Sequence, residues 1–320
     1  MRVAAGARPR PLARLALALA AALVIAGCAA PQAGPPRAAR TAADGLPDPV
    51  RVAGVPFVAQ PDWQCGPAAL AIAMAAAGRP VPVETLSRDA FTPALQGSLQ
   101  AEMIAATRRQ GLLATELPAS LDALSRELAA GRPVIVLQNL GLEWFPRWHY
   151  AVVTGVDRAL GEVVLHSGDT PSLSMRLSTF ERTWARSGRW AIAITPPDRL
   201  PASADETAVL RAVVALERVD PAAAAAAWEA VVARWPHSRI GLFGRANRRL
   251  ADGEPRRAVP DLVAALALDP GFADAWNNLA RALQASGRVD AARLAADRAV
   301  ALGGPRLGAY LDTRAALGRP

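Results

Sequence analysis

The chain has 320 residues, enough for about two domains, and 52% of them are hydrophobic, which excludes a disordered chain as the default class. All 36 basic residues are arginines, and half of the formal net charge of +8 lies in the first 28 residues. No cluster of arginines is interleaved with aromatic residues, so the composition gives little support for nucleic-acid binding.

The N-terminus predicts an export signal of the lipoprotein type. Four arginines open it, and an apolar stretch from Leu15 to Ala26 follows that is too short to span a bilayer comfortably. The stretch ends in Ile25-Ala26-Gly27-Cys28, which resembles the lipobox of bacterial lipoproteins. The resemblance implies that residues 1–27 are removed and that Cys28 becomes the lipidated N-terminus. The alternative is an ordinary signal peptide that contains a cysteine by chance.

The residues after Cys28 predict where the chain is held. Ala29 rather than aspartate follows it, which in Gram-negative lipoproteins implies sorting to the outer membrane. The segment from Pro31 to Asp48 is rich in alanine, proline, glycine and arginine. We therefore expect residues 28–50 to be a lipidated cysteine and a flexible tether, with the chain anchored in the cell envelope and facing the periplasm.

Cys65 is the one cysteine left if Cys28 is lipidated, so it has no disulfide partner in an oxidising compartment. Such a thiol is either buried and inert or chemically used. An apolar run of helix formers from Ala68 to Ala77 places Cys65 at or just before a helix N-terminus, where free N–H groups and the helix dipole stabilise a thiolate. Gln60, five residues earlier, could join the Cys65 N–H in an oxyanion hole.

The candidate general base is His149. It begins a β-branched run to Asp157, and a second strand from Glu162 to Leu165 follows a short turn, which predicts an antiparallel hairpin. A cysteine at a helix start and a histidine on a distant strand form the papain-type arrangement. Taken singly, each residue also has a structural explanation, as a small buried cysteine or a packed histidine.

Together the two motifs resemble one family. Gln60…Cys65-Gly66-Pro67-Ala68-Ala69-Leu70 and the run from His149 to Gly155 look like the bacteriocin-processing, double-glycine-leader cysteine peptidases. They look even more like stand-alone lipoprotein relatives that carry tetratricopeptide repeats. The resemblance covers residues 51–197 and implies a papain-like α+β domain, with Gln60 in the oxyanion hole, Cys65 as nucleophile and His149 as base. Because the sequence shows no ATP-binding motif, cleavage after double glycine is not carried over.

The third catalytic position departs from the family pattern, which usually places Asp or Asn at the end of the strand after the histidine. Here that strand ends in Val164-Leu165-His166-Ser167-Gly168-Asp169. Our choice for the residue that orients His149 is Asp169. Ser167, which lies closest to the family's acidic position, or a backbone carbonyl is the alternative.

Other features of the first domain are open to two interpretations or carry no motif. The aromatic loop from Gly141 to Trp148 holds Trp144, Phe145 and Trp148, and these rings either cover the core or line a substrate groove. His166 and His237 have no motif support and are interpreted as structural. Three histidines, one spare cysteine and no acidic cluster predict no metal site, and nothing predicts a cofactor.

The second half of the chain has a period of 34 residues. Helix-ending pairs fall at Trp235-Pro236, Asp269-Pro270 and Gly303-Gly304, and Gly253 and Gly287 are also 34 apart. This is the tetratricopeptide period, and it predicts an all-α solenoid over residues 205–305 with two well-defined repeats and a degenerate first one. The solenoid is either a structural appendage or a concave surface for a protein partner.

The sequence therefore predicts a lipid-anchored cysteine endopeptidase that acts on a peptide or protein substrate. Two alternatives remain: a catalytically idle binding or scaffold lipoprotein of the cell envelope, and an amidase or acyltransferase that uses the same Cys-His pair.

Overall fold

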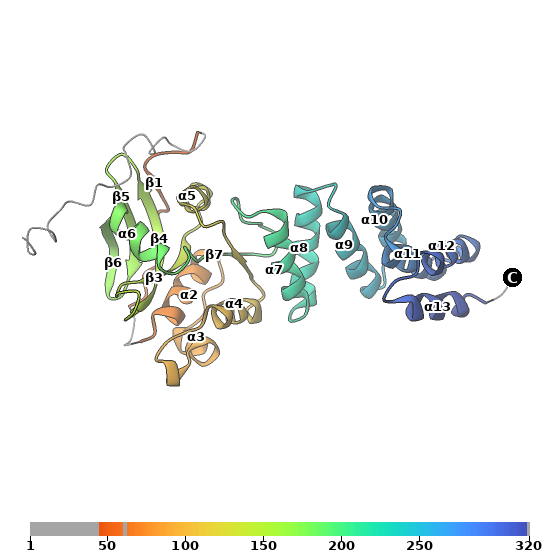
Figure 1. Cartoon of the computed structure of the whole chain (residues 1–320), viewed down its shortest axis with the longest axis horizontal. Helices are drawn as coiled ribbons and strands as arrows, with labels where there is room; N and C mark the ends of the chain where they lie inside the picture. The colour runs from red at the N-terminus through yellow and green to blue at the C-terminus, as the bar shows by residue number, and fades with distance from the viewer. Residues whose placement is uncertain (1–44, 60–62, 319–320) are drawn as a thin grey trace, which may run out of the picture. The chain divides into compact units, whose positions relative to one another are not determined.

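The computed structural model describes residues 45–59 and 63–318. The first half of the chain contains an antiparallel sheet. The strands are β1 (Val50–Arg51), β2 (Leu113–Glu116), β3 (Val134–Asn139), β4 (Trp148–Asp157), β5 (Glu162–Ser167), β6 (Thr170–Arg176) and β7 (Ala191–Thr195). Their order is β2-β7-β3-β4-β5-β6, and each described pairing is antiparallel (Figure 1). The longest strand pairing joins the two central strands, β3 and β4.

Strand β1 pairs with the part of β4 that β3 does not reach. The first residue of β3, Val134, pairs with Val153 of β4, and β1 pairs antiparallel with Gly155 and Val156 of β4. A Cβ on Gly155 would lie 2.8 Å from the Arg51 side chain and 3.2 Å from the Val50 carbonyl oxygen. Glycine at position 155 is therefore what lets β1 approach β4.

Both faces of β3 and β7 are buried, which explains why these two strands are runs of mostly apolar residues. Along β3, Val134 and Val136 belong to one hydrophobic cluster, whereas Ile135 and Leu137 belong to the other. One face is covered by α2 (Cys65–Ala76), α3 (Val83–Ala90) and α4 (Gln100–Arg109). The opposite face is covered by α5 (Leu121–Ala129) and α6 (Leu177–Ala185).

The second half of the chain is helical and repeats with the predicted period. Its helices are α7 (Glu206–Glu217), α8 (Pro221–Arg234), α9 (Arg239–Ala251), α10 (Pro255–Leu268), α11 (Ala273–Ala285), α12 (Val289–Leu302) and α13 (Leu307–Ala316), which follow one another in Figure 1. The starts of α8, α10 and α12 are 34 residues apart, as are those of α9, α11 and α13. The degenerate first repeat is thus a helix pair, α7 and α8.

Helix starts and crossings in this half follow from particular residues. The side chains of Asp205, Asp220 and Ser238 accept hydrogen bonds from the first-turn amides of α7, α8 and α9. A Cβ on Gly244 of α9 would lie 2.5 Å from the Trp228 ring of α8, so glycine permits this close crossing.

The first helix pair shares a core with the sheet. Val209, Val213 and Leu216 of α7 and Trp228 of α8 belong to the same hydrophobic cluster as Val136. Nearby, buried Glu127 of α5 accepts hydrogen bonds from the backbone N–H of Ser203, at 2.7 Å, and from its hydroxyl, at 2.6 Å. The predicted boundary near residues 197–205 therefore falls inside a continuous hydrophobic cluster.

The predicted fold class is confirmed: an α+β domain with an antiparallel sheet precedes a helical-repeat region. The predicted hairpin is β4 and β5. No sequence pattern predicted β2, α5, β6 or α6. Within the described residues, no helix has the length and apolar character needed to span a bilayer.

Candidate functional site

Cys65 is the first residue of α2, as the sequence predicts. The preceding Gln64 does not cap the helix, because its side-chain oxygen accepts a 2.6 Å hydrogen bond from the Ser87 hydroxyl. Gly66 is required by close packing, since a Cβ there would lie 2.4 Å from the Ser98 hydroxyl oxygen. Cys65 is a free, partly buried thiol at the start of α2.

Two opposing effects act on the pKa of the Cys65 thiol. Burial is the larger and raises the pKa, because a buried thiolate loses its hydration. Backbone N–H groups of Tyr150, Gly66 and Cys65 itself interact with the sulfur and lower the pKa, but only in part. The net shift is upward.

His149 lies on β4, opposite Gln138 of β3. Its Nε2 is 2.8 Å from the hydroxyl oxygen of Ser167 at the end of β5. Nδ1 is therefore the ring nitrogen left for a thiol. Burial lowers the pKa of His149, and the positive charge of Arg147 lowers it further. A raised thiol pKa and a lowered imidazole pKa together favour the neutral pair in the free protein.

The hydrogen bond to His149 corrects the expected third member. Asp169, our choice from the sequence, is exposed in the turn between β5 and β6. No hydrogen bond or ion pair joins it to His149 among the described contacts, and Ser167, the alternative, holds the ring instead. The reason is strand length: β5 extends to Ser167, so this residue lies beside β4 and Asp169 falls in the turn.

Gln60 and Cys28, the other predicted site residues, lie outside the described residues. Their roles in the oxyanion hole and in lipid attachment stay predictions.

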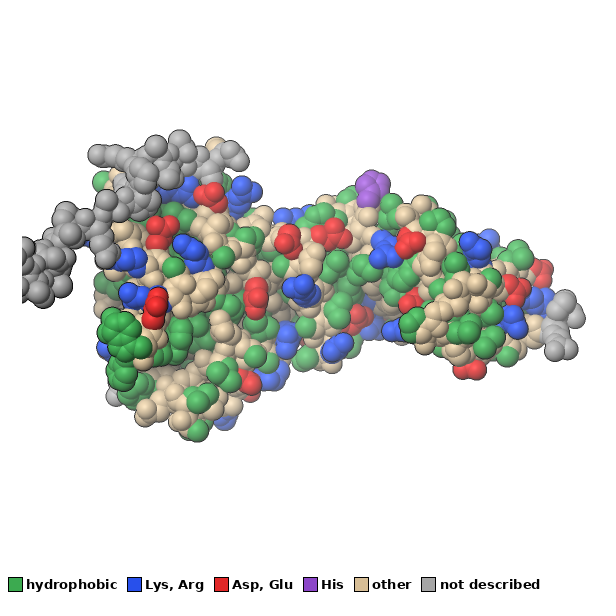
Figure 2. All heavy atoms as spheres, in the orientation of Figure 1, with side chains coloured by type: hydrophobic (Ala, Val, Ile, Leu, Met, Phe, Trp, Pro, Cys, Tyr) green, Lys and Arg blue, Asp and Glu red, His purple; other side chains and the backbone are tan. Residues whose placement is uncertain are grey.

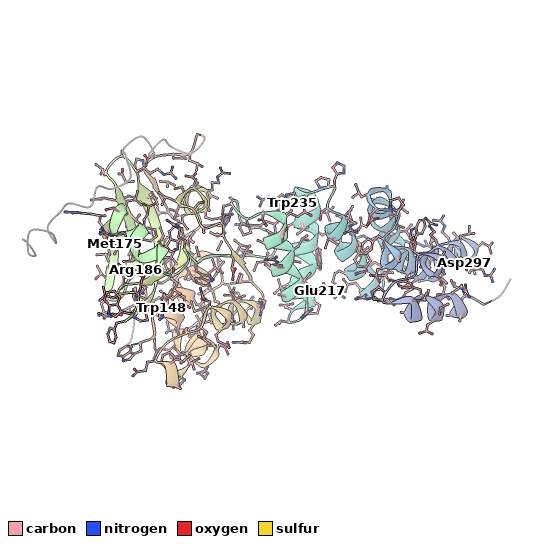
Figure 3. The ribbon with its side chains drawn as sticks, viewed as in Figure 1. Trp148, Met175, Arg186, Glu217, Trp235 and Asp297 are labelled. Carbon is pink, nitrogen blue, oxygen red and sulfur yellow. The ribbon has the colours of Figure 1, made fainter. Side chains whose placement is uncertain are left out.

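Cys65 and His149 line one cavity of about 820 Å³. Asp169 also lines it, and Trp148 and Arg186, both labelled in Figure 3, lie on its wall. The other lining residues are Trp63, Leu95, Gln96, Gly97, Ser98, Leu99, Gln100, Leu137, Pro146, Arg147, Tyr150, Gly168 and Ser187. The cavity places a cysteine at a helix start and a histidine on a strand around a common space, the arrangement of a papain-type cysteine peptidase.

The aromatic loop does not cover the core. Trp144 is 81% exposed and Phe145 76%, so the core interpretation is wrong for both. Trp148 is 52% exposed and lines the cavity, which fits the groove interpretation for that residue alone.

Several lining residues were missed in the sequence. Trp63, two residues before Cys65, and Tyr150, directly after His149, are adjacent to motif residues and could have been inferred from that position. The wall formed by residues 95–100 carries no motif, and only the tertiary fold brings it to the site. One of its contacts is the 3.1 Å hydrogen bond from the Tyr150 hydroxyl to the Ser98 carbonyl.

His166 is structural, as expected. Its Nδ1 accepts a 3.0 Å hydrogen bond from the Ser172 amide, and its Nε2 lies 3.2 Å from the Val55 carbonyl oxygen. The ring also packs edge-on against Phe57. His166 thus fixes the extended segment around Val55 and Phe57, which leads toward Cys65, to the end of β5.

The helical repeats carry an apolar groove of about 440 Å³ on α10, α11 and α12, where Val263 and Leu294 are 51% and 73% exposed. Elsewhere, Asn278 of α11 donates a 2.7 Å hydrogen bond to Asn247 of α9, which joins the first helices of successive repeats. Neither feature identifies a ligand.

Comparison with protein families confirms the predicted resemblance. Residues 52–192 match the model of the Peptidase_C39 like family, and residues 249–317 match a tetratricopeptide-repeat model. The chain thus carries a C39-like peptidase domain followed by a tetratricopeptide-repeat region. A comparison with curated proteins gave no match.

Solved structures of both kinds are similar to parts of the chain. A C39-like peptidase from Bacillus anthracis is 19% identical, with a TM-score of 0.39 over 47% of this chain and 98% of that one. The peptidase domain of Streptococcus ComA, a bifunctional ABC transporter, is 22% identical, with a TM-score of 0.37 over 44% and 98%. A double mutant of MamA RS-1 is 20% identical, with a TM-score of 0.33 over 35% of this chain and 64% of that one, less than two thirds of its length. MamA from Desulfovibrio magneticus RS-1, beginning at residue 41, is 18% identical, with a TM-score of 0.30 over 44% of this chain and 78% of that one.

Proposed function

We propose that the C39-like domain is a cysteine endopeptidase with Cys65 as nucleophile and His149 as general base. The observation that carries this proposal is that both residues line one cavity, with Nε2 of His149 bonded to Ser167 and Nδ1 left for the thiol. This is the division of roles that a thiol–imidazole pair needs, with one ring nitrogen oriented and the other reactive.

The chemistry begins with transfer of the Cys65 thiol proton to Nδ1 of His149. The sulfur then attacks the carbonyl carbon of the scissile peptide bond, and the Cys65 amide stabilises the oxyanion, with Gln60 as second donor by resemblance to the family. His149 returns the proton to the leaving amine, which leaves a thioester on Cys65. Water, deprotonated by His149, hydrolyses the thioester and restores the thiol.

We further propose that the chain is exported, lipidated on Cys28 and held in the outer membrane facing the periplasm. The support is the apolar stretch that ends in the lipobox-like Ile25-Ala26-Gly27-Cys28 and the Ala29 that follows. The tetratricopeptide repeats would bind the substrate or a protein partner, because successive repeats build an extended surface from one helix of each pair.

A second candidate function, an inactive peptidase-like scaffold, is favoured by one group of observations. The pKa of Cys65 is raised, the pKa of His149 is lowered, and a neutral hydroxyl takes the position where the family usually has Asp or Asn. All three weaken a thiolate–imidazolium pair.

Hydrolysis of a quenched-fluorescent peptide library by the purified chain separates the two functions. The peptidase proposal expects cleavage that Cys65→Ala abolishes and His149→Ala nearly abolishes. Leu160→Ala, in the exposed turn between β4 and β5, is the matched control and should cleave like wild type. Library peptides left intact while purified peptidoglycan is digested would instead identify an amidase. Binding of library peptides without turnover would favour the scaffold.

A further inference from the structure

The loop between β3 and β4 carries a group of large apolar side chains that are neither buried in the core nor part of the cavity lining. Leu142 is 48% exposed, Trp144 81% and Phe145 76%, and none of the three lines the cavity beside His149. We call these three residues the apolar tip. In Figure 2, hydrophobic side chains gather at the lower left of the visible face, the part of the domain where Figure 3 labels Trp148.

The loop is held in its conformation by hydrogen bonds at its base. The side-chain oxygen of Asn139 accepts from the amides of Gly141 and Arg147, both at 2.9 Å. The guanidinium of Arg186, from the end of α6, donates a 2.6 Å hydrogen bond to the Gly141 carbonyl. These bonds fix both ends of the loop to the sheet and to α6.

The tip itself is a tight turn. Leu142 and Phe145 exchange backbone hydrogen bonds of 3.1 and 3.2 Å. A Cβ on Gly141 would lie 2.4 Å from the Phe145 carbonyl oxygen, so the turn closes only with glycine there. The exposure of Trp144 and Phe145 is therefore a consequence of a defined loop and not of a chain without fixed contacts.

The shape and composition of the apolar tip select one kind of partner. Rings that are three-quarters or more exposed stand clear of their neighbours, so they form a projection with no groove in which a peptide could be held. A projecting group of tryptophan, phenylalanine and leucine fits a soft apolar phase, because such side chains partition into the interface of a bilayer. We propose that the apolar tip inserts into the surface of a phospholipid bilayer and thereby holds the cavity lined by Cys65 and His149 next to the membrane.

Charges around the tip are compatible with an anionic lipid surface. Arg147 and Arg186 are exposed at the base of the loop, where a guanidinium can meet lipid phosphates. Glu143 is the one acidic residue within the turn, and it lies next to exposed Trp144. The basic side chains outnumber it.

Geometry allows tip insertion and N-terminal anchoring at the same time. β1 pairs with β4 at Gly155 and Val156, whereas the loop that carries the apolar tip joins β4 at Trp148. Along β4, Trp148 and Gly155 are roughly 24 Å apart at the rise of a strand. The sixteen residues from Ala29 to Asp44 would span up to about 55 Å if fully extended. The cavity would then face substrates at the membrane surface. This inference does not depend on peptidase activity.

The experiment uses residues 45–320, because every buried hydrophobic residue of the described chain lies between Val50 and Leu317. An N-terminal histidine tag holds this chain on vesicles that contain nickel-chelating lipid, so that neither Cys28 nor its lipid is needed. Cys65→Ser removes the remaining thiol, and Phe145→Cys carries an environment-sensitive nitrobenzoxadiazole probe. Leu294→Cys, at a position of matched exposure on α12, is the control.

On vesicles of phosphatidylethanolamine and phosphatidylglycerol, the probe at position 145 should shift its emission to the blue. It should lose about half or more of its fluorescence when the acyl chains are brominated, since interfacial side chains reach the acyl boundary. The probe at position 294 should do neither. Adding Trp144→Ser and Leu142→Ser should restore access of aqueous iodide to the probe at position 145.

Three outcomes would overturn the proposal. In the first, iodide reaches the probes at positions 145 and 294 equally on vesicles. In the second, the probe remains shielded after both serine substitutions, which would mean that the probe itself partitions into lipid. In the third, shielding requires an added leucine-rich peptide, which would make the tip a peptide-binding element.

Discussion

The hydroxyl oxygen of Ser167 lies 2.8 Å from Nε2 of His149, in the position where a carboxylate or amide is expected from the family resemblance. A hydroxyl can orient the ring, but it carries no charge to stabilise an imidazolium. With burial raising the pKa of Cys65 and lowering that of His149, this contact predicts a thiol that is unreactive in the free protein at neutral pH. The first predictions test this relationship.

Alkylation of wild-type Cys65 by iodoacetamide should accelerate as the pH rises and should have its midpoint above the ordinary range of a thiol pKa. The sign follows from burial: the thiolate, which is the reactive form, is disfavoured, so more alkaline solution is needed to populate it. Mass spectrometry of the adduct across pH 5 to about 10 measures the profile. A rate that is already maximal at pH 5 would show a stable thiolate–imidazolium pair and contradict the expectation.

Ser167→Asp should move the midpoint of this alkylation profile down by about one pH unit or more. A carboxylate at Nε2 raises the pKa of His149, and the resulting imidazolium lowers the pKa of Cys65. Ser167→Asn keeps a hydrogen bond without the charge and should leave the midpoint unchanged. Asp169→Asn should not move it either, because Asp169 makes no contact with the ring among the described contacts.

The effect of Ser167→Asp must pass through the imidazole. Combined with His149→Ala, it should no longer lower the midpoint. A shift that persists in the double variant would mean that the new carboxylate acts elsewhere, and the proposed orienting role of Ser167 would be wrong.

Gln60→Ala should reduce peptide turnover by roughly 100-fold, the usual effect of removing one oxyanion donor. Because such a donor acts on the transition state, kcat should fall while KM changes little. Steady-state kinetics on a cleaved library peptide measure both constants. Gln110→Ala, at the end of α4, is the control. An equal loss in both variants would point to a folding defect, and no loss in Gln60→Ala would remove that residue from the mechanism.

Cys28→Ser should abolish lipid attachment. The cysteine supplies both the cleavage boundary and the acylated group in the lipoprotein pathway that the lipobox resemblance implies. Intact mass and membrane fractionation of the expressed chain measure the effect, and Cys65→Ser should keep the lipid. Unchanged mass and fractionation of the Cys28 variant would exclude a lipoprotein.

A chain cut after position 205 should be much less stable than one cut after position 236. The shorter chain loses Val209, Val213 and Leu216 from the cluster that covers the sheet. Full burial of each contributes about 1.5–3 kcal/mol, so their sum is comparable to the whole stability of a domain. Chemical denaturation of residues 45–205 and 45–236 compares the two. Equal unfolding midpoints would show that α7 and α8 do not stabilise the sheet.

Much of the fold could be predicted because local patterns control it. The helix that begins at Cys65 follows from a turn and a run of helix formers, and the hairpin of β4 and β5 follows from two β-branched runs. The helix pairs follow from a period of 34 residues, which survives even in the degenerate first repeat. By contrast, β2 and β6 carry weak strand patterns and are stabilised by pairing with β7 and β5.

For the candidate site, the sequence by itself determined that Cys65 begins a helix and that His149 lies on a strand, since both are local structures with recognisable neighbours. Only the tertiary structure decided that Ser167 and not Asp169 meets His149, because the length and register of β5 determine which residue lies beside β4. It also decided that Trp144 and Phe145 face outward, since the hydrogen bonds that Asn139 accepts and Arg186 donates shape their loop. Hydrophobic pattern cannot distinguish an aromatic ring that packs on a core from one that a loop projects into solvent; contacts made far along the chain do.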